Sequence, residues 1–203
     1  MGAFDLQVNG YAGVDFNGDL LSGEDLDQVC EALKKDGVGG ILATFMTDDL
    51  GVMCSRMERL VQLRNQNREW SKLICGVHIE GPFLNETQGY IGAHPVKHAK
   101  RSDLGEMKRL LEAAGGLTRI VTLAPERDEG FMVTRFLTEQ GVCVAAGHCD
   151  PSIKQLQESI EAGLKMFTHL GNGCPMELNR HDNVIQRVLS QRHDLWISFI
   201  PDG

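Results

Sequence analysis

The feature of this sequence that most restricts its fold is a regular alternation between two kinds of segment. Short runs rich in apolar and β-branched residues alternate with segments whose apolar residues recur at helical spacing. The runs predict seven strands separated by six helices, with strands expected at 4–10, 39–47, 72–80, 117–126, 141–148, 163–170 and 194–203. Such alternation is typical of the α/β class, in which helices cover a parallel sheet.

The expected helices carry recognisable boundary signals. Ser22 and Ser152 precede apolar residues at helical spacing, as capping residues do, and Gly37 follows the first of these helices as a stop. A long loop is expected between the third strand and its helix, from 81 to about 102. A loop of this length inside a compact domain is usually functional.

A parallel sheet of this kind can be an open doubly wound sheet or an eight-stranded barrel. No G-x-G-x-x-G run follows the first strand, which disfavours the dinucleotide-binding form of the open sheet. Seven units that end abruptly at Gly203 favour a (β/α)8 TIM-type barrel cut before its eighth strand. We therefore expect a single domain over 1–203, an incomplete barrel.

The composition excludes several classes of partner and location. The formal charge is −8 and no run of like charges occurs, which disfavours nucleic acid and anionic membrane surfaces as partners. No apolar run approaches the roughly 20 residues of a membrane span, and the N-terminal stretch MGAFDLQVNG does not resemble a signal peptide. Six scattered cysteines without a C-x-x-C pair favour a reducing compartment, so we expect a cytoplasmic protein.

Three ligand-type residues end apolar strands of the expected sheet. Glu80 follows ICGVHI, His148 follows CVAAG and His169 follows KMFT. A buried carboxylate without a partner is costly, so Glu80 needs an N–H group, an arginine or a metal ion. Because chemistry in such barrels lies at the carboxyl ends of the strands, the three side chains are expected to converge. Two imidazoles and a carboxylate with one open position make a catalytic zinc-type site.

Each of these residues taken alone has a simpler explanation. A single histidine at a strand end is more often a hydrogen-bonded structural group than a ligand, and Glu80 alone fits a turn cap. For His94, in the long loop, the sequence does not decide between substrate contact and a solvated side chain. Arg180 in NRHDN suits a phosphate or carboxylate because its planar fork binds two oxygens, although surface arginines are common. Other polar residues at strand ends are Gln7, Asn9, Thr44, Thr47, His78, Glu126 and Asp202.

Several motifs occur together in one order along the chain. They are DLQVNG (5–10), HIEGPFLN (78–85), GAH (92–94), VTLAPE (121–126), GHCD (147–150) and THLGN (168–172). In this combination the sequence resembles the N-acetylglucosamine-6-phosphate deacetylase family of the amidohydrolase superfamily. The resemblance implies a metal-dependent amidohydrolase barrel with flanking β-sandwich segments that this chain lacks, and a homodimer when the protein is full length.

The resemblance also implies roles for individual residues. It implies one divalent ion, zinc in preference to iron, held by Glu80, His148 and His169. It implies that a catalytic aspartate lies beyond residue 203, on the eighth strand. The implied substrate contacts are Ala93, His94, Asn172, Gly173, Arg180 (toward the sugar phosphate), Asp202 and Gly203.

The sequence departs from the family pattern at three places. Gln7-Val8-Asn9 replaces the His-x-His of many amidohydrolases, and because amides are poor zinc ligands this favours a single-metal site. Gly173-Cys174 replaces the usual Ala-Met after the asparagine, and the NRHDN run around Arg180 also differs. The eighth strand and its aspartate are missing.

The expected reaction is hydrolysis of the acetamide of N-acetylglucosamine 6-phosphate, a small-molecule substrate, to glucosamine 6-phosphate and acetate in amino-sugar catabolism. Two alternatives remain open. One is another amidohydrolase that acts on a related N-acyl amino sugar or a cyclic amide, which the change at Gly173 and Cys174 suggests. The other is a non-catalytic fragment that binds a sugar phosphate.

Overall fold

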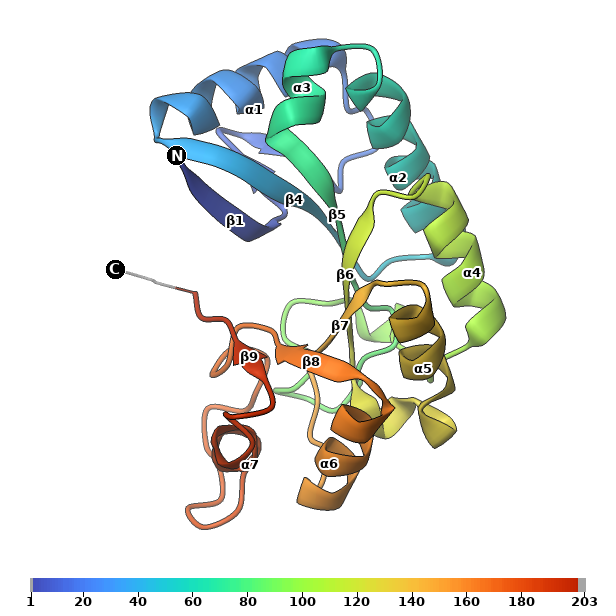
Figure 1. Cartoon of the computed structure of the whole chain (residues 1–203), viewed down its shortest axis with the longest axis vertical. Coiled ribbons are helices and arrows are strands. Elements are labelled where there is room, and N and C mark those ends of the chain that lie inside the picture. The colour runs from blue at the N-terminus through green and yellow to red at the C-terminus, as the bar shows by residue number, and fades with distance from the viewer. Residues whose placement is uncertain (1, 201–203) are drawn as a thin grey trace. The chain divides into compact units, whose positions relative to one another are not determined.

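The computed structural model describes residues 2–200, and its helices and strands are labelled in Figure 1. Two compact units are distinguished by their internal contacts. The first contains residues up to Glu80 together with Lys108–Arg119, and the second contains Gly81–Met107 together with the chain from Ile120 onward. The predicted substrate contacts at Asp202 and Gly203 lie outside the described residues.

The structure contains a seven-stranded sheet, and the order of the strands in the sheet is their order in the sequence. The strands are β1 (Ala3–Val8), β4 (Val38–Met46), β5 (Ile74–Glu80), β6 (Thr118–Leu123), β7 (Cys143–Ala146), β8 (Leu164–Phe167) and β9 (Trp196–Ile197). The pairs β1–β4 and β4–β5 are parallel, as are β6–β7, β7–β8 and β8–β9. The α/β class and the seven strands expected from the sequence are therefore confirmed.

The first unit carries helices α1 (Gly23–Lys35), α2 (Leu50–Arg64) and α3 (Arg68–Leu73), and most of α4 (Leu104–Ala113). Ser22 caps α1 in a capping box with Asp25, as the sequence indicated. The apolar face of α1 is buried, and the helix packs on β4 and α3. β4 pairs in turn with β5, the strand that ends at Glu80.

Two elements of the first unit differ from the sequence prediction. The third strand begins at Ile74 rather than at 72, because Asn67 caps the short helix α3, in which Trp70 and Leu73 are buried. An antiparallel hairpin of β2 (Gly10–Tyr11) and β3 (Val14–Asp15) follows β1. Its two turn residues both have positive φ, at 52° and 86°, as a two-residue hairpin turn of type I′ requires.

The second unit carries α5 (Met132–Glu139), α6 (Ile153–Ala162) and α7 (Val184–Ser190). Three 3₁₀ helices, η1 (Val96–His98), η2 (Pro125–Arg127) and η3 (Glu129–Phe131), lie in the connections. Ser152 caps α6 in a capping box with Gln155, again as expected. In the chain, β7 ends two residues before His148 and β8 ends two residues before His169.

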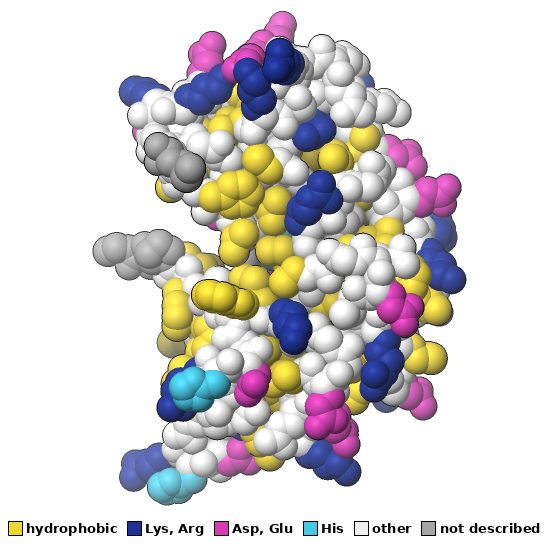
Figure 2. All heavy atoms as spheres, viewed as in Figure 1, with side chains coloured by type: hydrophobic (Ala, Val, Ile, Leu, Met, Phe, Trp, Pro, Cys, Tyr) yellow, Lys and Arg dark blue, Asp and Glu magenta, His cyan; other side chains and the backbone are white. Residues whose placement is uncertain are grey.

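Apolar side chains remain at the surface on the two terminal strands of the sheet order. Phe4 and Leu6 of β1 are exposed, and so is Trp196 of β9. The face viewed in Figure 2 accordingly shows hydrophobic side chains among the charged ones. None of the helices between residues 2 and 200 is long and apolar enough to span a membrane.

Candidate metal site

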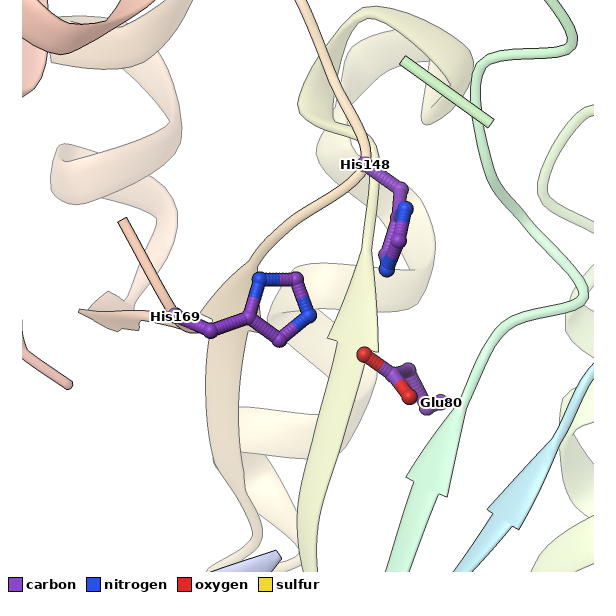
Figure 3. A group of neighbouring side chains, drawn as sticks. All are labelled: Glu80, His148 and His169. Atoms are coloured by element: carbon purple, nitrogen blue, oxygen red, sulfur yellow. The ribbon is translucent and has the colours of Figure 1, made fainter. Parts of the chain in front are cut away.

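The structure brings Glu80, His148 and His169 together. All three are buried, with 1, 6 and 4 % of their surface exposed. One ligand-type atom from each residue lies within 4.8 Å of the corresponding atoms of the others. In Figure 3 the carboxylate and a nitrogen of each imidazole point toward one another. Among residues 2–200, this cluster is the group of three or more His, Cys, Asp or Glu side chains that could hold a metal ion.

Both histidines have a left-handed backbone conformation. The φ angle is 50° at His148 and 37° at His169. Such angles are uncommon in residues other than glycine, and they cost on the order of 1–3 kcal/mol unless neighbouring contacts maintain them. The Asn85 N–H donates to the carbonyl of His148 at 3.0 Å, and the His169 N–H donates to Ser198 Oγ at 2.8 Å. Strained residues of this kind cluster at functional sites.

One hydrogen bond defines the tautomer of His148. Its Nδ1 lies 2.9 Å from the carbonyl oxygen of Tyr90, and a carbonyl can only accept, so Nδ1 carries the proton. In the neutral ring, Nε2 therefore carries the lone pair that a cation would bind. Metal-binding histidines usually donate their other N–H to a carbonyl or carboxylate in this way.

The donor set fits a divalent metal ion. Two imidazoles and one carboxylate are the ligands of many catalytic zinc sites, and ferrous iron accepts the same set. A cation would also balance the buried charge of Glu80, which ends β5 directly before Gly81. The Gly81 N–H donates to the carbonyl of Thr122 at 3.0 Å, which fixes the backbone immediately after the carboxylate.

The predicted substrate residues near His148 come from two loops. His94 is buried, and its ring meets that of His148 edge to face with centroids 4.3 Å apart. Gly173, with a φ of 62°, lies so close that a Cβ atom there would be 2.7 Å from Nδ1 of His148. The Asn172 N–H donates to the carbonyl of His169 at 2.9 Å, and Ala93 is exposed. His94, Gly173 and Asn172 therefore contact the two histidines, and Ala93 directly precedes His94 in the chain.

Three of the other predicted positions have hydrogen bonds to other residues. Arg180 is exposed before α7, and its carbonyl accepts a hydrogen bond from Gln186 Nε2 at 2.8 Å. In the first unit, the Gln7 N–H donates to Asp5 Oδ1 at 2.9 Å. The amide of Asn9 donates to the sulfur of Met46 at 3.3 Å. The Gln7 contact is made by its backbone, and the Asn9 contact ties the end of β1 to the end of β4.

Sequence reasoning assigned no role to a set of polar residues around His148. Glu126 Oε1 accepts from Asn85 Nδ2 at 2.8 Å and from the Asp150 N–H at 2.6 Å. Burial raises the pKa of Glu126 above its ordinary value, partly offset by these hydrogen bonds. Asn85, Glu126 and Asp150 all lie inside the motifs HIEGPFLN, VTLAPE and GHCD. Their place in those motifs was the signal that could have identified them.

Tyr90 and Arg187 were also missed, and no local pattern marks them. The hydroxyl of Tyr90 donates to Asp150, and burial together with this hydrogen bond raises the pKa of Tyr90 to about 12. Arg187 Nη1 donates to Asp150 Oδ1 at 2.7 Å, and its Nε donates to Asp182 Oδ1 at 2.6 Å. The pKa of Arg187 is raised, chiefly by the bond to Asp182.

Comparison with known proteins identifies relatives over the whole chain, although no family model matches it. An N-acetylglucosamine-6-phosphate deacetylase of Bacillus subtilis (strain 168) is 31% identical over 100% of this chain and 50% of its own length. An N-acetylgalactosamine-6-phosphate deacetylase of Escherichia coli O157:H7 is 29% identical over 98% of this chain and 51% of its own.

A solved structure is similar in fold as well as in sequence. It is a variant of the N-acetyl-D-glucosamine-6-phosphate deacetylase of Mycobacterium smegmatis in complex with N-acetyl-D-glucosamine-6-phosphate. Its TM-score is 0.86 at 27% identity, over 100% of this chain and 50% of that one. The chain thus spans about half the length of the curated relatives that it matches.

Proposed function

This chain belongs to the N-acetylglucosamine-6-phosphate deacetylase family, and we propose that the protein that contains it hydrolyses N-acetylglucosamine 6-phosphate. The products would be glucosamine 6-phosphate and acetate. The observation that carries the proposal is the buried group of Glu80, His148 and His169, which offers a metal-binding donor set at strand ends. The names of the relatives supply the substrate class.

The proposed cofactor is one divalent metal ion, zinc in preference to iron, with Glu80, His148 and His169 as its ligands. When bound, such an ion supplies a Lewis acid for the amide carbonyl and a source of activated water at neutral pH. The amides Gln7 and Asn9, in place of histidines, support a single ion. Proton transfer is assigned to an aspartate that the family resemblance places after residue 203.

The chain's own residues would bind and orient the substrate. His94 lies edge-on to His148 and is buried, so it is suited to hydrogen-bond the acetyl carbonyl or a sugar hydroxyl beside the metal ligands. Asn172 and the backbone of Gly173 are suited to hold the sugar, since they lie only three and four residues after His169. Arg180 is charged and exposed in the same segment, and its fork fits a phosphate. Ala93 completes this proposed set, with a further contribution from Asp202 and Gly203.

We also propose that the seven strands are part of an eight-stranded barrel, with 1–203 in one domain, in a homodimeric cytoplasmic enzyme. Exposed apolar side chains on β1 and β9 support the further strand, because terminal strands of a sheet that expose Phe4, Leu6 and Trp196 are suited to pairing. The scattered cysteines support a reducing compartment.

A second candidate substrate is another N-acetylated hexosamine 6-phosphate. The support for it is the relative named for N-acetylgalactosamine 6-phosphate together with the change at Gly173 and Cys174. The two sugars differ only in the configuration of one hydroxyl, so a panel of both phosphates would decide. A higher kcat/KM for the galactose form would replace the first assignment.

The decisive experiment measures metal content and metal affinity in purified wild-type protein and in the variants Glu80→Gln, His148→Ala and His169→Ala. We expect about one ion per chain in the wild type and a loss of affinity of at least about 100-fold in each variant, because every ligand of a three-residue site is essential. His193→Ala, at an exposed histidine, serves as the matched control. Equal metal content in all the variants would contradict the ligand assignment.

A further inference from the structure

The orientation of His148 depends on the position of one backbone carbonyl. The ring donates through Nδ1 to the oxygen of Tyr90, 2.9 Å away. Along the Nδ1–Cε1 edge its neighbours are Gly92 and Gly173, which have no side chains to pack against the ring. A Cβ atom at Gly92 would lie 3.0 Å from Cε1. The hydrogen bond to Tyr90 therefore directs the imidazole together with the ring contacts from His94 and His169.

The position of the Tyr90 carbonyl is restrained in turn by contacts of the Tyr90 side chain. The Tyr90 hydroxyl donates to Asp150, which lies two residues after His148 in the chain. Asp150 is held in turn by Arg187, whose Nη1 donates to Asp150 Oδ1 at 2.7 Å and to the carbonyl of Pro151 at 3.0 Å. Arg187 thus ties helix α7 to the turn after β7, and Tyr90 ties that turn to the loop after β5.

From this closed set of contacts we propose that Tyr90, Asp150 and Arg187 form a positioning network for the imidazole of His148. The network presents the Tyr90 carbonyl to Nδ1 and so directs the opposite ring nitrogen toward Glu80 and His169. None of its side chains is proposed to touch the ion or the substrate. The inference rests on the proposed function, because it takes His148 to be a metal ligand.

The chain offers a matched test, because it contains two tyrosines and each donates its hydroxyl to an aspartate. Tyr11 donates to Asp36 Oδ2 at 2.6 Å, at an exposed position in the first unit. Tyr90→Phe and Tyr11→Phe therefore remove the same hydroxyl and the same kind of hydrogen bond. Asp150→Asn is a second variant, which keeps an acceptor for Tyr90 but removes the charge that faces Arg187.

The measurements are the zinc dissociation constant, by competition with a chelator, and the visible absorption spectrum of the cobalt-substituted protein. We expect Tyr90→Phe to weaken zinc binding about tenfold, the lower end of the range for losing an outer partner of a metal-binding histidine, because the Tyr90 carbonyl remains but is less well held. The cobalt spectrum should change as the ligand rotates. Asp150→Asn should give a smaller loss, and Tyr11→Phe should match the wild type in both measurements.

Wild-type zinc affinity and an unaltered cobalt spectrum in Tyr90→Phe would overturn the proposal, as would equal losses in the two tyrosine variants. The failure of the proposed function has a different signature. In that case His148→Ala and His169→Ala would bind zinc as the wild type does, and the network would have no ligand to position. A loss in the histidine variants combined with a normal Tyr90→Phe would overturn the network alone.

Discussion

Two segments of the second unit flank the histidines and are held in different ways. The stretch 81–85 after β5 is buried, and its backbone bonds to other strand ends, with Asn85 donating to His148 and Phe83 accepting from Ala124. The stretch 171–183 after β8 is mostly exposed and bonds largely to itself. There the side-chain oxygen of Asn179 accepts from the N–H groups of His181 and Asp182 at 2.9 and 3.2 Å.

The difference separates two tasks of the proposed site. The buried segment is hydrogen-bonded to His148, a proposed metal ligand, so changes there should affect folding and metal binding together. The exposed segment carries Gly173, Cys174 and Arg180, where the sequence departs from the family pattern. Surface loops tolerate change better than buried ones because their backbone groups can bond to water. Substrate preference can therefore vary at exposed positions of the second segment, such as Arg180, without disturbing the first.

The largest expected contrast comes from the same substitution in the two segments. Asn85→Ala removes a buried side chain that donates to the carboxylate of Glu126, and we expect a loss of about 2 kcal/mol in the free energy of unfolding. Asn179→Ala should cost only about 0.5 kcal/mol, because the N–H groups it leaves can bond to water. Urea unfolding measures both values. Equal losses would remove the distinction between the segments.

A smaller effect is expected from two glycines in the exposed segment, both with positive φ. Gly173→Ala places a methyl group against His148, whereas Gly171→Ala meets nothing within 4 Å. Each should lose about 1 kcal/mol of stability from backbone strain. Only Gly173→Ala should also weaken zinc binding, by about tenfold, because it displaces the imidazole of a proposed metal ligand. Identical zinc affinities in the two variants would show that Gly173 does not constrain the ring.

The smallest expected effect is confined to substrate binding. Arg180→Gln should raise KM for the sugar phosphate about fivefold, the effect of one exposed charged contact, with kcat and zinc affinity unchanged. Arg192→Gln, at another exposed arginine of this unit, is the control. A fall in zinc affinity in Arg180→Gln would mean that Arg180, like Gly173, affects the metal site.

Sequence reasoning succeeded where a residue's place follows from the fold alone. Strand ends in a parallel sheet lie at one edge, so Glu80, His148 and His169 could be grouped from their positions after apolar runs. It failed where the partner lies far along the chain. Tyr90 and Arg187 reach Asp150 from positions 60 residues before it and 37 after it, and no periodicity or motif encodes such a contact. Helix α3 was missed because its single capped turn and a half merges into the strand that follows.

The left-handed backbone at His148 and His169 has a consequence for protein engineers. An ideal strand alternates its side chains between the two faces of a sheet, so neither histidine could be moved into a straight strand and keep its direction. Anyone grafting this trio onto another parallel sheet would have to copy the turns that follow β7 and β8, with Asn85 and Ser198 as their braces. The unit to transfer is the pair of turns together with the hydrogen bonds that hold them, because the three side chains alone would not keep their directions.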